Sequence, residues 1–440
     1  MLKVLFCLIE FRIFFPYANN MTRTILHIDF DSFFASCEQQ FNPILKGKPL
    51  GVTATNGRTC IIAASREAKT FGIKTGTRSW EAKKLCPQII FIPASFVKYL
   101  EISKKFLNIC KDYSPFVELF SIDEVFIDMT RTSHLFGGID RAIKLIKTRI
   151  KKEIGECITV SVGVSHNKLL AKLASSINKP NGLFEIKFSN LNDVYQKSKL
   201  TDICGIGERI KSRLNLMGVY NLLQLRKVSL TALVSEFGNA EAFFLKNVGL
   251  GVDTAEVIPY TIPCDVKSVG RNYCLPKNEY NQRIILQNIY ELCEEVGIKL
   301  RRLEKKARTV GISLRGSLDI HGRKTFQDHF DCGKEIFNHC RILLNRESPC
   351  YIQQGDSLQE EYVRQISIWV SGLQDKNKLP LSLFDKEKRN ERLLSTIDLI
   401  NEKFGDHTIR NGFLIYADKL TTVPNGYMAD KYERIKLSKF

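Results

Sequence analysis

The segment LFSIDEVFID, residues 119–128, places two acids, Asp123 and Glu124, side by side inside a run of strand-forming apolar residues. Burying an unpaired carboxylate costs free energy, and two neighbouring carboxylates raise each other's pKa. Either the strand breaks at the acids, so that they face water, or the acids hold a cation. A tight turn at residues 121–124 would join two strands and bring both carboxylates to one hairpin tip.

A third acid, Asp29, lies on the polar face of another predicted strand. Apolar and polar side chains alternate in TILHIDFDSF, which is the pattern of a strand with one buried face. If this strand neighbours the hairpin, the three carboxylates converge, and they would repel one another without cations. Hard oxygen ligands of this kind select Mg²⁺. The pattern favours a two-metal phosphoryl-transfer site, and the alternative is a hairpin whose exposed turn is acidic.

Two basic clusters could hold a triphosphate at such a site. Arg66 and Lys69 lie in SREAK, and Lys168 and Lys172 lie in NKLLAK. The second pair is spaced i, i+4, so both ammonium groups lie on one helix face near the helix start, where the helix dipole favours phosphate. A lone lysine pair is more often a solvated helix face. Beside a carboxylate hairpin, we predict that it contacts phosphate.

Two aromatic residues, Phe33 and Phe34, follow the strand that carries Asp29. A rigid ring this close to a metal-binding carboxylate could close off the 2′ position of a sugar and select deoxyribose by exclusion. The other interpretation is that the ring belongs to the core. We assign Phe33 to the core, and the residues alone leave both interpretations open for Phe34.

Size and charge limit the fold and the partners. With 440 residues the chain exceeds one ordinary core, so we expect about three or four folding units. The net charge of +18 favours an anionic partner; nucleic acid is the leading candidate, with membrane surfaces and RNA-rich complexes as alternatives. Residues 33–98 are a basic stretch, with ten Lys or Arg against three Glu. None of the thirteen cysteines forms a C-x-x-C pair, so we expect reduced thiols in a cytosolic protein.

The first residues, MLKVLFCLIEFRIFFPYANN, are apolar, but Glu10 and Arg12 interrupt the run, which is also too short to span a bilayer. We expect either that Met21 is the biological start or that residues 1–21 are a loosely held extension. An N-terminal membrane-associating segment is the alternative.

Helix and strand patterns alternate along the rest of the chain. Isoleucines at spacings of three and four predict a helix over 139–154, ITVSVGVS at 158–165 predicts a strand, and NKLLAKLASSIN at 167–178 predicts another helix. Residues 190–252 are helical in composition, and the prolines of IPYTIPC mark an extended linker. A final unit contains the strand candidates ARTVGISLRG and QISIWVSGL, with a helix around FNHCRILL. The sequence therefore predicts an α+β fold.

The turn CGIGERI is similar to that of a helix-hairpin-helix. Its glycines, Gly205 and Gly207, would expose backbone N–H groups that can bind a DNA phosphate without reading sequence. Glycine is common in helix–helix turns, so the glycines alone are weak evidence for DNA binding. The position of the turn in a basic chain, after the predicted carboxylate site, is what supports that role.

Together these segments resemble a known family. HIDFDSFFASCEQ, TFGIKTG, LFSIDEVFID, SVGVSHNKLLAKLASSINKPNG, CGIGERI and SVGRN occur in the order and spacing of the Y-family translesion DNA polymerases of the DinB/UmuC type, over about residues 22–372. The resemblance implies a right-hand polymerase with a ferredoxin-like palm. The implied domains are a palm (22–32 and 99–188), small fingers (33–98), a helical thumb with a helix-hairpin-helix (189–252), a linker (253–261), a separate little finger (262–372) and a C-terminal tail (373–440).

The resemblance also implies roles for individual residues. Its implied catalytic residues and ligands of two Mg²⁺ ions are Asp29, Asp123 and Glu124, with the Phe30 carbonyl as a further metal ligand. Its implied nucleotide-binding residues are Phe33, Phe34 (as the steric gate), Arg66, Lys69 and Lys172, and its DNA-binding residues are Gly205, Gly207 and Arg271. Asp31 has no metal role in the family, and we assign it a structural one. Many relatives have tyrosine and arginine where this chain has Arg66 and Lys69. The SREAK form of this chain is closer to the UmuC branch, and its arginine can still bind phosphate.

The peptide LPLSLF, near the C-terminus, is similar to a degenerate sliding-clamp-binding peptide. Leu381, Leu383 and Phe384 would be the apolar plugs, and Pro380 stands where the family often has glutamine. A weakened clamp contact and an apolar patch that folds against its own domain are the two alternatives.

The sequence thus predicts a low-fidelity DNA-templated DNA polymerase, active in translesion synthesis, DNA repair and the SOS response. Its expected partners are primer-template DNA and deoxynucleoside triphosphates, with a sliding clamp and an accessory subunit as further candidates. We expect a cytoplasmic monomer without membrane attachment. The alternatives are a nucleotidyl cyclase, which would share the carboxylate hairpin, and a non-catalytic DNA-binding accessory protein that has kept the fold.

Overall fold

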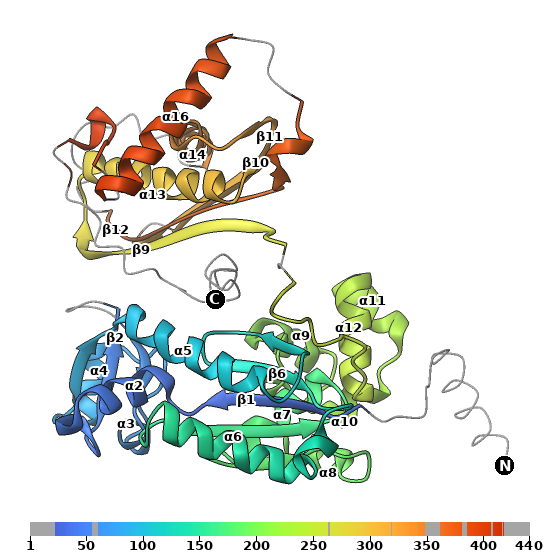
Figure 1. The fold of residues 1–440 in the computed structure, drawn as a ribbon. Helices are drawn as coiled ribbons and strands as arrows, with labels where there is room; N and C mark the ends of the chain where they lie inside the picture. Colours follow the sequence, from blue (N-terminus) through green and yellow to red (C-terminus); the bar gives the residue numbers. More distant parts are fainter. Residues whose placement is uncertain are drawn as a thin grey trace. The chain divides into compact units, whose positions relative to one another are not determined.

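The computed structural model describes residues 23–54, 60–262, 265–317, 319–347, 361–380, 385–405, 408–415 and 417. These residues divide into two compact units, and their helices and strands are drawn in Figure 1. The first contains residues 23–47 and 95–262, and the second contains residues 48–94 and 265–417. The predicted extension at 1–21 lies outside the described residues, as do Leu381, Leu383 and Phe384 of the predicted clamp-binding peptide.

A five-stranded sheet in the order β5-β6-β1-β7-β8 forms the centre of the first unit. Strand β1 pairs antiparallel with both β6 and β7, and the edge strand β8 pairs parallel with β7. The strands are β1 Ile25–Phe30, β5 Val117–Leu119, β6 Glu124–Asp128, β7 Val160–Ser165 and β8 Leu183–Glu185. The predicted hairpin is formed by β5 and β6, which pair antiparallel.

Helices cover both faces of this sheet. Phe30 packs against Phe106 of α5, with ring centroids 4.4 Å apart, whereas His27 reaches Ser175 of α7. Because successive residues of a strand point to opposite faces, α5 and α7 lie on opposite sides of β1. The helices are α2 Phe33–Phe41, α5 Phe96–Lys111, α6 Ile139–Glu153 and α7 Lys168–Ile177. The helices predicted over 139–154 and 167–178 are confirmed as α6 and α7.

The rest of the first unit is helical, as the composition of residues 190–252 predicts. Its helices are α8 Leu191–Lys197, α9 Glu208–Leu216, α10 Leu222–Lys227, α11 Leu230–Phe237 and α12 Asn239–Leu250. Leu214, Leu222 and Leu245 are fully buried in their shared core. The segment after α12 is extended, and it is attached to β5, because the Tyr260 N–H donates to the Val117 carbonyl at 2.7 Å. The predicted linker is therefore held by the first unit over part of its length.

The second unit contains two sheets. The smaller has the order β3-β2-β4, and the larger is antiparallel in the order β11-β10-β12-β9, with the short β13 paired to β10. Elements of the smaller sheet region are β2 Leu50–Thr53, β3 Ile61–Ala64, α3 Arg66–Thr70, α4 Ser79–Leu85 and β4 Ile90–Pro93. Elements of the larger are β9 Ser268–Glu279, α13 Gln282–Arg302, β10 Lys305–Gly316, β11 Asp319–Phe330, α14 Gly333–Glu347, β12 Val363–Ser371, β13 Gln374–Asp375 and α16 Asp385–Phe404. The two predicted strands are β10 and β12, and the predicted helix between them is α14.

The folded part of this unit continues beyond Gly372, where we predicted a tail. Leu414 is buried in the same core as α13 and α14. Arg301 of α13 forms a two-pronged ion pair with Asp398 of α16, with N–O distances of 2.5 and 2.8 Å. Helix α16 and Leu414 therefore pack on the helices of the larger sheet.

We expect Leu414→Ala to lower the free energy of unfolding of the second unit by about 2–5 kcal/mol, because it leaves a cavity in the core. Leu414 is 1% exposed, whereas the adjacent Ile415 is 68% exposed, so Ile415→Ala is the matched control and should change stability by less than about 0.5 kcal/mol. Urea unfolding can be followed by the fluorescence of Trp369, in a Trp80→Phe background that removes the chain's other tryptophan. Equal losses in both variants would contradict a core role for Leu414.

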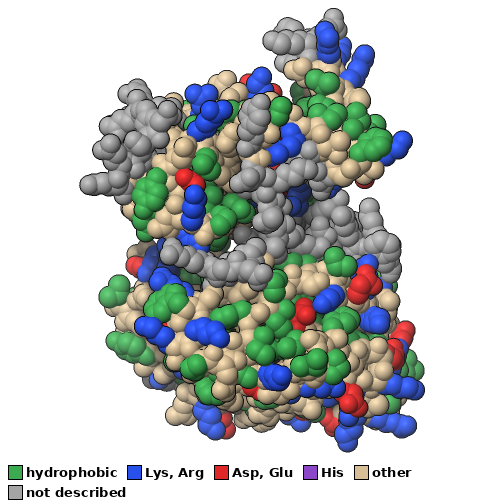
Figure 2. Space-filling view, turned by 90° about the vertical axis from the view of Figure 1, so that its left-hand side faces the viewer, with side chains coloured by type: hydrophobic (Ala, Val, Ile, Leu, Met, Phe, Trp, Pro, Cys, Tyr) green, Lys and Arg blue, Asp and Glu red, His purple; other side chains and the backbone are tan. Residues whose placement is uncertain are grey.

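On the face drawn in Figure 2, Lys and Arg side chains are scattered among hydrophobic and polar ones. Among the described helices, none is long and apolar enough to cross a membrane. The ten cysteines in the described ranges are all free, and five of them are buried.

Candidate active site

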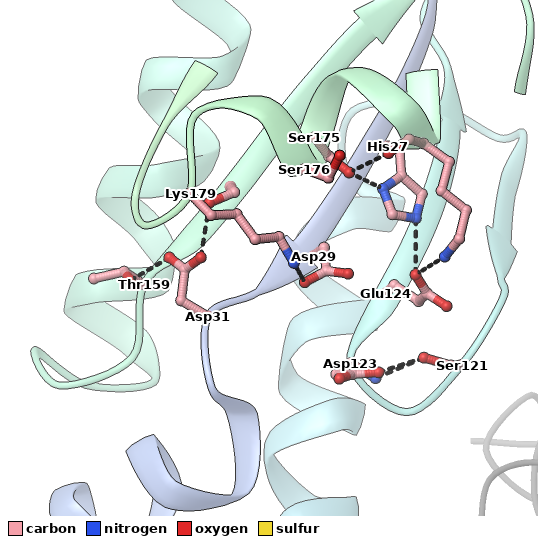
Figure 3. A network of polar contacts seen from close by, with 12 residues as sticks. His27, Asp29, Asp31, Ser121, Asp123, Glu124, Thr159, Ser175, Ser176 and Lys179 are labelled. Atoms are coloured by element: carbon pink, nitrogen blue, oxygen red, sulfur yellow. Dashed lines mark hydrogen bonds and ion pairs between the residues drawn. The ribbon is translucent and has the colours of Figure 1, made fainter. Parts of the chain in front are cut away.

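The three predicted carboxylates meet where β1 ends and β6 begins (Figure 3). The register of the β1–β6 pair sets Asp29 directly opposite Glu124. The next residue, Phe30, donates its N–H to the Asp123 carbonyl at 2.9 Å, which places the end of β1 beside the turn. Asp123 lies in that turn and accepts a hydrogen bond from the Ser121 hydroxyl. The strand therefore breaks just before Glu124, and both acids of the pair lie near Asp29.

Two lysines neutralise part of this negative charge. Lys172 of α7 forms an ion pair with Glu124, and Lys179, which follows α7, forms one with Asp29. Burial alone would raise the pKa of Glu124, but the hydrogen bond from His27 and the charge of Lys172 outweigh it and lower that pKa to about 2. Glu124 is thus held as a carboxylate.

The pKa values of the other two acids are raised, which means that the fold disfavours their ionised forms. Burial raises the pKa of Asp123 to about 6, and the neighbouring charge of Asp29 adds to the effect. Burial also raises the pKa of Asp29, although the charge of Lys179 opposes it. The cluster therefore has more negative charge than its lysines offset, which is the condition that a bound cation would relieve.

The chemistry of these side chains fits a divalent cation. One atom each of His27, Asp29 and Glu124 lie within 4.8 Å of one another, and in the part of the chain that the structure describes this is the one such group found. Asp123 is the residue directly before Glu124 in the chain. Clustered carboxylate oxygens are the ligands that Mg²⁺ and Mn²⁺ prefer. Asp29, Asp123 and Glu124 could hold such an ion, with the Phe30 carbonyl as the predicted further ligand.

Sequence reasoning missed His27 and Lys179. The His27 ring is fully buried, with Nε2 3.0 Å from Glu124 Oε2 and Nδ1 2.8 Å from the Ser175 hydroxyl oxygen. Burial lowers its pKa, although the hydrogen bond to Glu124 opposes this. The available signal was its position, two residues before Asp29 on the same strand face.

Of the two lysines predicted on one face of α7, only Lys172 reaches the carboxylates. Lys168, at the first position of the helix, pairs instead with Glu118 of β5 at 2.6 Å. Both lysines point toward the β5–β6 hairpin, as their i, i+4 spacing predicts. Because the two lysines lie four residues apart along the helix, each has a different partner. Lys168 pairs with Glu118 and does not contact the carboxylate cluster.

The two phenylalanines after β1 lie in different surroundings. Ser32, with a φ of +52°, turns the chain from β1 into α2. Phe33 is buried and stacks on Phe30, with centroids 4.8 Å apart, in agreement with a core role. Phe34 is only half-buried and stacks on Tyr99 at 4.5 Å, with Phe96 edge-on at 5.7 Å. Its ring is therefore held rigidly but is not enclosed.

Asp31 is fully engaged in holding the fold. Its carboxylate accepts hydrogen bonds from the Thr159 hydroxyl at 2.6 Å, the Ser161 hydroxyl at 2.7 Å and the Asn181 N–H at 2.7 Å. These bonds tie β1 to β7 and to the loop after α7, which suits the structural role that we predicted.

The predicted DNA-binding residues are dispersed. Gly205 has a φ of +105°, and a Cβ there would lie 2.6 Å from the Phe244 ring, so the turn before α9 needs a glycine. Gly207 immediately precedes α9. Arg271 on β9 lies 3.0 Å from Glu295 of α13, so its guanidinium is directed toward the helices that cover the sheet.

Arg66 and Lys69 both lie on α3 in the second unit. Arg66 is partly buried and Lys69 is exposed. Their contact with a nucleotide stays a prediction.

The chain matches known proteins over most of its length. The profile of the impB/mucB/samB family matches residues 28–176, and the profile of that family's C-terminal domain matches residues 266–383. The chain is 34% identical over 390 residues to DNA polymerase IV of Pelotomaculum thermopropionicum, covering 88% of this chain and 94% of that protein. It is also 34% identical over 322 residues to DNA polymerase IV of Bacteroides fragilis, covering 73% of this chain and 85% of the relative.

A solved structure with a similar fold points the same way. It is a Y-family DNA polymerase chimera, Dbh-Dpo4(243-245)-Dbh, which matches with a TM-score of 0.65 and 26% sequence identity, over 79% of this chain and 98% of the chimera. The family profiles match parts of both units. The chain therefore belongs to the Y family of DNA polymerases, in its DinB-type branch.

Proposed function

We propose that this DNA-directed DNA polymerase extends a primer 3′ end with low fidelity, using two Mg²⁺ ions, and that it acts in translesion synthesis and DNA repair. The observation that carries the proposal is the convergence of Asp29, Asp123 and Glu124 where β1 meets β6. Membership of the family supplies the substrates, which are primer-template DNA and deoxynucleoside triphosphates. It also disfavours the nucleotidyl-cyclase alternative, and the presence of all three acids disfavours a non-catalytic role.

The chain's own contribution to catalysis is position and charge. Mg²⁺ ions held by these residues would lower the pKa of the attacking 3′ hydroxyl and neutralise charge on the phosphates. Asp29, Asp123 and Glu124 would hold the cations, with the Phe30 carbonyl as a further ligand. Because these groups are fixed by the pairing of β1 with β6, the site needs little rearrangement, and alignment of the reacting groups would provide much of the rate enhancement.

Basic side chains would bind the triphosphate. Lys172 stands beside the carboxylates, and its ion pair with Glu124 can be exchanged for one with phosphate. Arg66 and Lys69 are the further candidates. Phe34, held against Tyr99, would exclude a 2′ hydroxyl.

We expect Lys172→Ala to lower kcat/KM for nucleotide addition about 10- to 100-fold, mainly by raising KM for the nucleotide, because one charged hydrogen bond to phosphate is lost. Lys168→Ala is the matched control: the residue lies one helical turn earlier and is also ion-paired, but with Glu118. It should change kcat/KM by less than about threefold, corresponding to a small effect from an ion pair away from the substrate. Steady-state kinetics on one primer-template measures both. A larger loss in the Lys168 variant would contradict the assignment.

DNA would be held by backbone and side-chain groups outside the cluster. The N–H groups near Gly205 and Gly207 are the proposed phosphate contacts of the thumb. Arg271 could reach DNA only by leaving its ion pair with Glu295. A sliding clamp bound through Leu381, Leu383 and Phe384, and an accessory subunit, are further proposed partners. We place the enzyme in the cytoplasm, as a monomer that responds to DNA damage.

Primer extension with Mg²⁺ and deoxynucleotides, on undamaged and abasic-site templates, tests this function. We expect the intact protein to extend both primers and to misincorporate frequently opposite undamaged bases. Extension only on the undamaged template would leave a polymerase without the proposed bypass role. Tight primer-template binding without any extension, even with a clamp supplied, would overturn the catalytic proposal.

A further inference from the structure

The His27 side chain lies between Glu124 of the carboxylate cluster and Ser175 of α7. Its ring is fully buried on the α7 side of β1, beside the Phe126 ring at a centroid distance of 4.6 Å. Its two nitrogens have separate partners: Nε2 is 3.0 Å from Glu124 Oε2, and Nδ1 is 2.8 Å from the Ser175 hydroxyl oxygen (Figure 3). The ring therefore links a helix residue to one of the acids.

These partners determine which nitrogen carries the proton. A neutral imidazole has one N–H donor and one acceptor nitrogen, and a carboxylate accepts only. Nε2 must therefore carry a hydrogen and donate it to Glu124. Nδ1 lies against the Ser175 hydroxyl, whose one hydrogen serves either Nδ1 or the Lys172 carbonyl oxygen. The Ser175 hydroxyl also lies 2.8 Å from the Lys172 carbonyl oxygen, so the helix backbone fixes its position in turn.

His27 holds Glu124 in a way that Lys172 cannot. Both contact Glu124 Oε2, but the Lys172 ammonium is assigned to the triphosphate under the proposed function. When Lys172 turns to substrate, it gives up Glu124. His27 has no other position available, because its ring is enclosed by β1, Phe126 and α7. It can keep one carboxylate oxygen fixed throughout the reaction.

We propose that His27, oriented by Ser175, is a positioning residue that holds the Glu124 carboxylate in place for binding the divalent cation. The inference rests on the proposed function, and it adds to that function a determinant of metal affinity outside the acids. Groups that hydrogen-bond a metal ligand from behind commonly change metal affinity or activity by about 10- to 100-fold when they are replaced.

Four variants separate positioning from packing. His27→Phe keeps an aromatic ring but removes both nitrogens, and His27→Gln retains an N–H that can donate to Glu124. Ser175→Ala removes only the hydroxyl that contacts His27 Nδ1 and leaves the contact between Nε2 and Glu124. Ser176→Ala is the matched control, because Ser176 is the next residue on α7 and makes the equivalent bond to a backbone carbonyl, of Leu173 at 2.7 Å, while its side chain is exposed.

Mn²⁺ binding to the full-length protein, measured by the electron paramagnetic resonance of free Mn²⁺, gives a readout independent of catalysis. We expect His27→Phe to weaken binding about 10- to 100-fold, His27→Gln to recover part of the loss, and Ser175→Ala to fall between wild type and His27→Phe. Ser176→Ala should match the wild type. In primer extension, His27→Phe should raise the Mg²⁺ concentration for half-maximal rate and lower kcat, with little change in the nucleotide KM at saturating Mg²⁺.

The proton position can be observed directly. In ¹⁵N-histidine NMR of the wild type, the signal that His27→Phe removes should belong to a ring that carries a hydrogen on Nε2. A ring without a hydrogen on Nε2 would overturn the proposal.

Three other outcomes would also overturn it. These are wild-type Mn²⁺ affinity in His27→Phe, equal losses in Ser175→Ala and Ser176→Ala, and losses in His27→Phe and His27→Gln that are equal and follow a lower unfolding temperature. If the wild type binds Mn²⁺ in a His27-dependent way but extends no primer, the positioning role stands and the proposed function fails.

Discussion

Asp123→Asn is expected to reduce primer extension by about a thousandfold, equivalent to about 4 kcal/mol of lost transition-state stabilisation, while leaving the metal-free fold at least as stable. Asparagine has nearly the same shape but removes the negative charge that would hold a cation. In the wild type, burial and the charge of Asp29 raise the pKa of Asp123 to about 6, so its ionised form is unfavourable in the folded protein. Removing that charge relieves repulsion. Single-turnover extension and thermal unfolding in EDTA measure the two effects.

Glu118→Gln is the control for this prediction. Glu118 is an acid on the neighbouring strand β5, and it pairs with Lys168 rather than facing the cluster. It should retain extension within a few-fold of wild type. If Asp123→Asn extends primers at the wild-type rate, or loses activity only because it unfolds, Asp123 is not part of the catalytic site. A loss of activity without a loss of stability would show that Asp123 serves catalysis at a cost to the stability of the fold.

The carboxylate cluster was predictable because it depends on local patterns. Alternation identified the strand of Asp29, and the broken apolar run identified the hairpin of Asp123 and Glu124. Only the register of β1 against β6 was needed to bring them together, and a one-residue slip would have moved Asp29 to the other face of the sheet.

The contacts that tune the cluster depend on tertiary packing and were missed. Lys179 lies 150 positions from Asp29 in the chain, and Ser175 lies 148 positions from His27. Lys168 and Lys172 are equivalent in the sequence pattern, and only the placement of α7 against the hairpin gives them different partners. Spacing along a helix predicts a shared face but does not predict what that face contacts.

The second unit shows a different limit. Strand β11 was missed because its sequence, DIHGRKTFQDHF, is mostly polar and buries little apolar surface beyond Ile320 and Phe330. It is ordered by its pairing with β10. Likewise, Arg271 is assigned to DNA by resemblance, but the register of β9 turns it toward Glu295. Polar strands and the direction of their side chains are determined by neighbours that lie far away in the sequence.

Phe34→Ala is expected to raise kcat/KM for ribonucleotides relative to deoxynucleotides by about 10²- to 10³-fold. If the ring blocks a 2′ hydroxyl, its removal relieves a clash worth about 3–4 kcal/mol. The stacking of Phe34 on Tyr99, with Phe96 edge-on, keeps the ring from moving aside for the larger sugar. Incorporation of matched ribo- and deoxynucleotides opposite one template base, measured separately, gives the ratio.

The adjacent Phe33 provides the control that distinguishes exclusion from general loosening of α2. Phe33 is 4% exposed and packs on Phe30, so Phe33→Ala should destabilise the protein by about 3–5 kcal/mol, and any contact from its backbone to the nucleotide is retained. Its ribonucleotide ratio should stay near the wild-type value among molecules that remain folded. If both variants relax sugar selection equally, looser packing is the cause and Phe34 is not a gate. If only Phe34→Ala does so, the half-buried ring is the selective element, because the two residues share a helix and a side-chain type and differ in what the fold encloses.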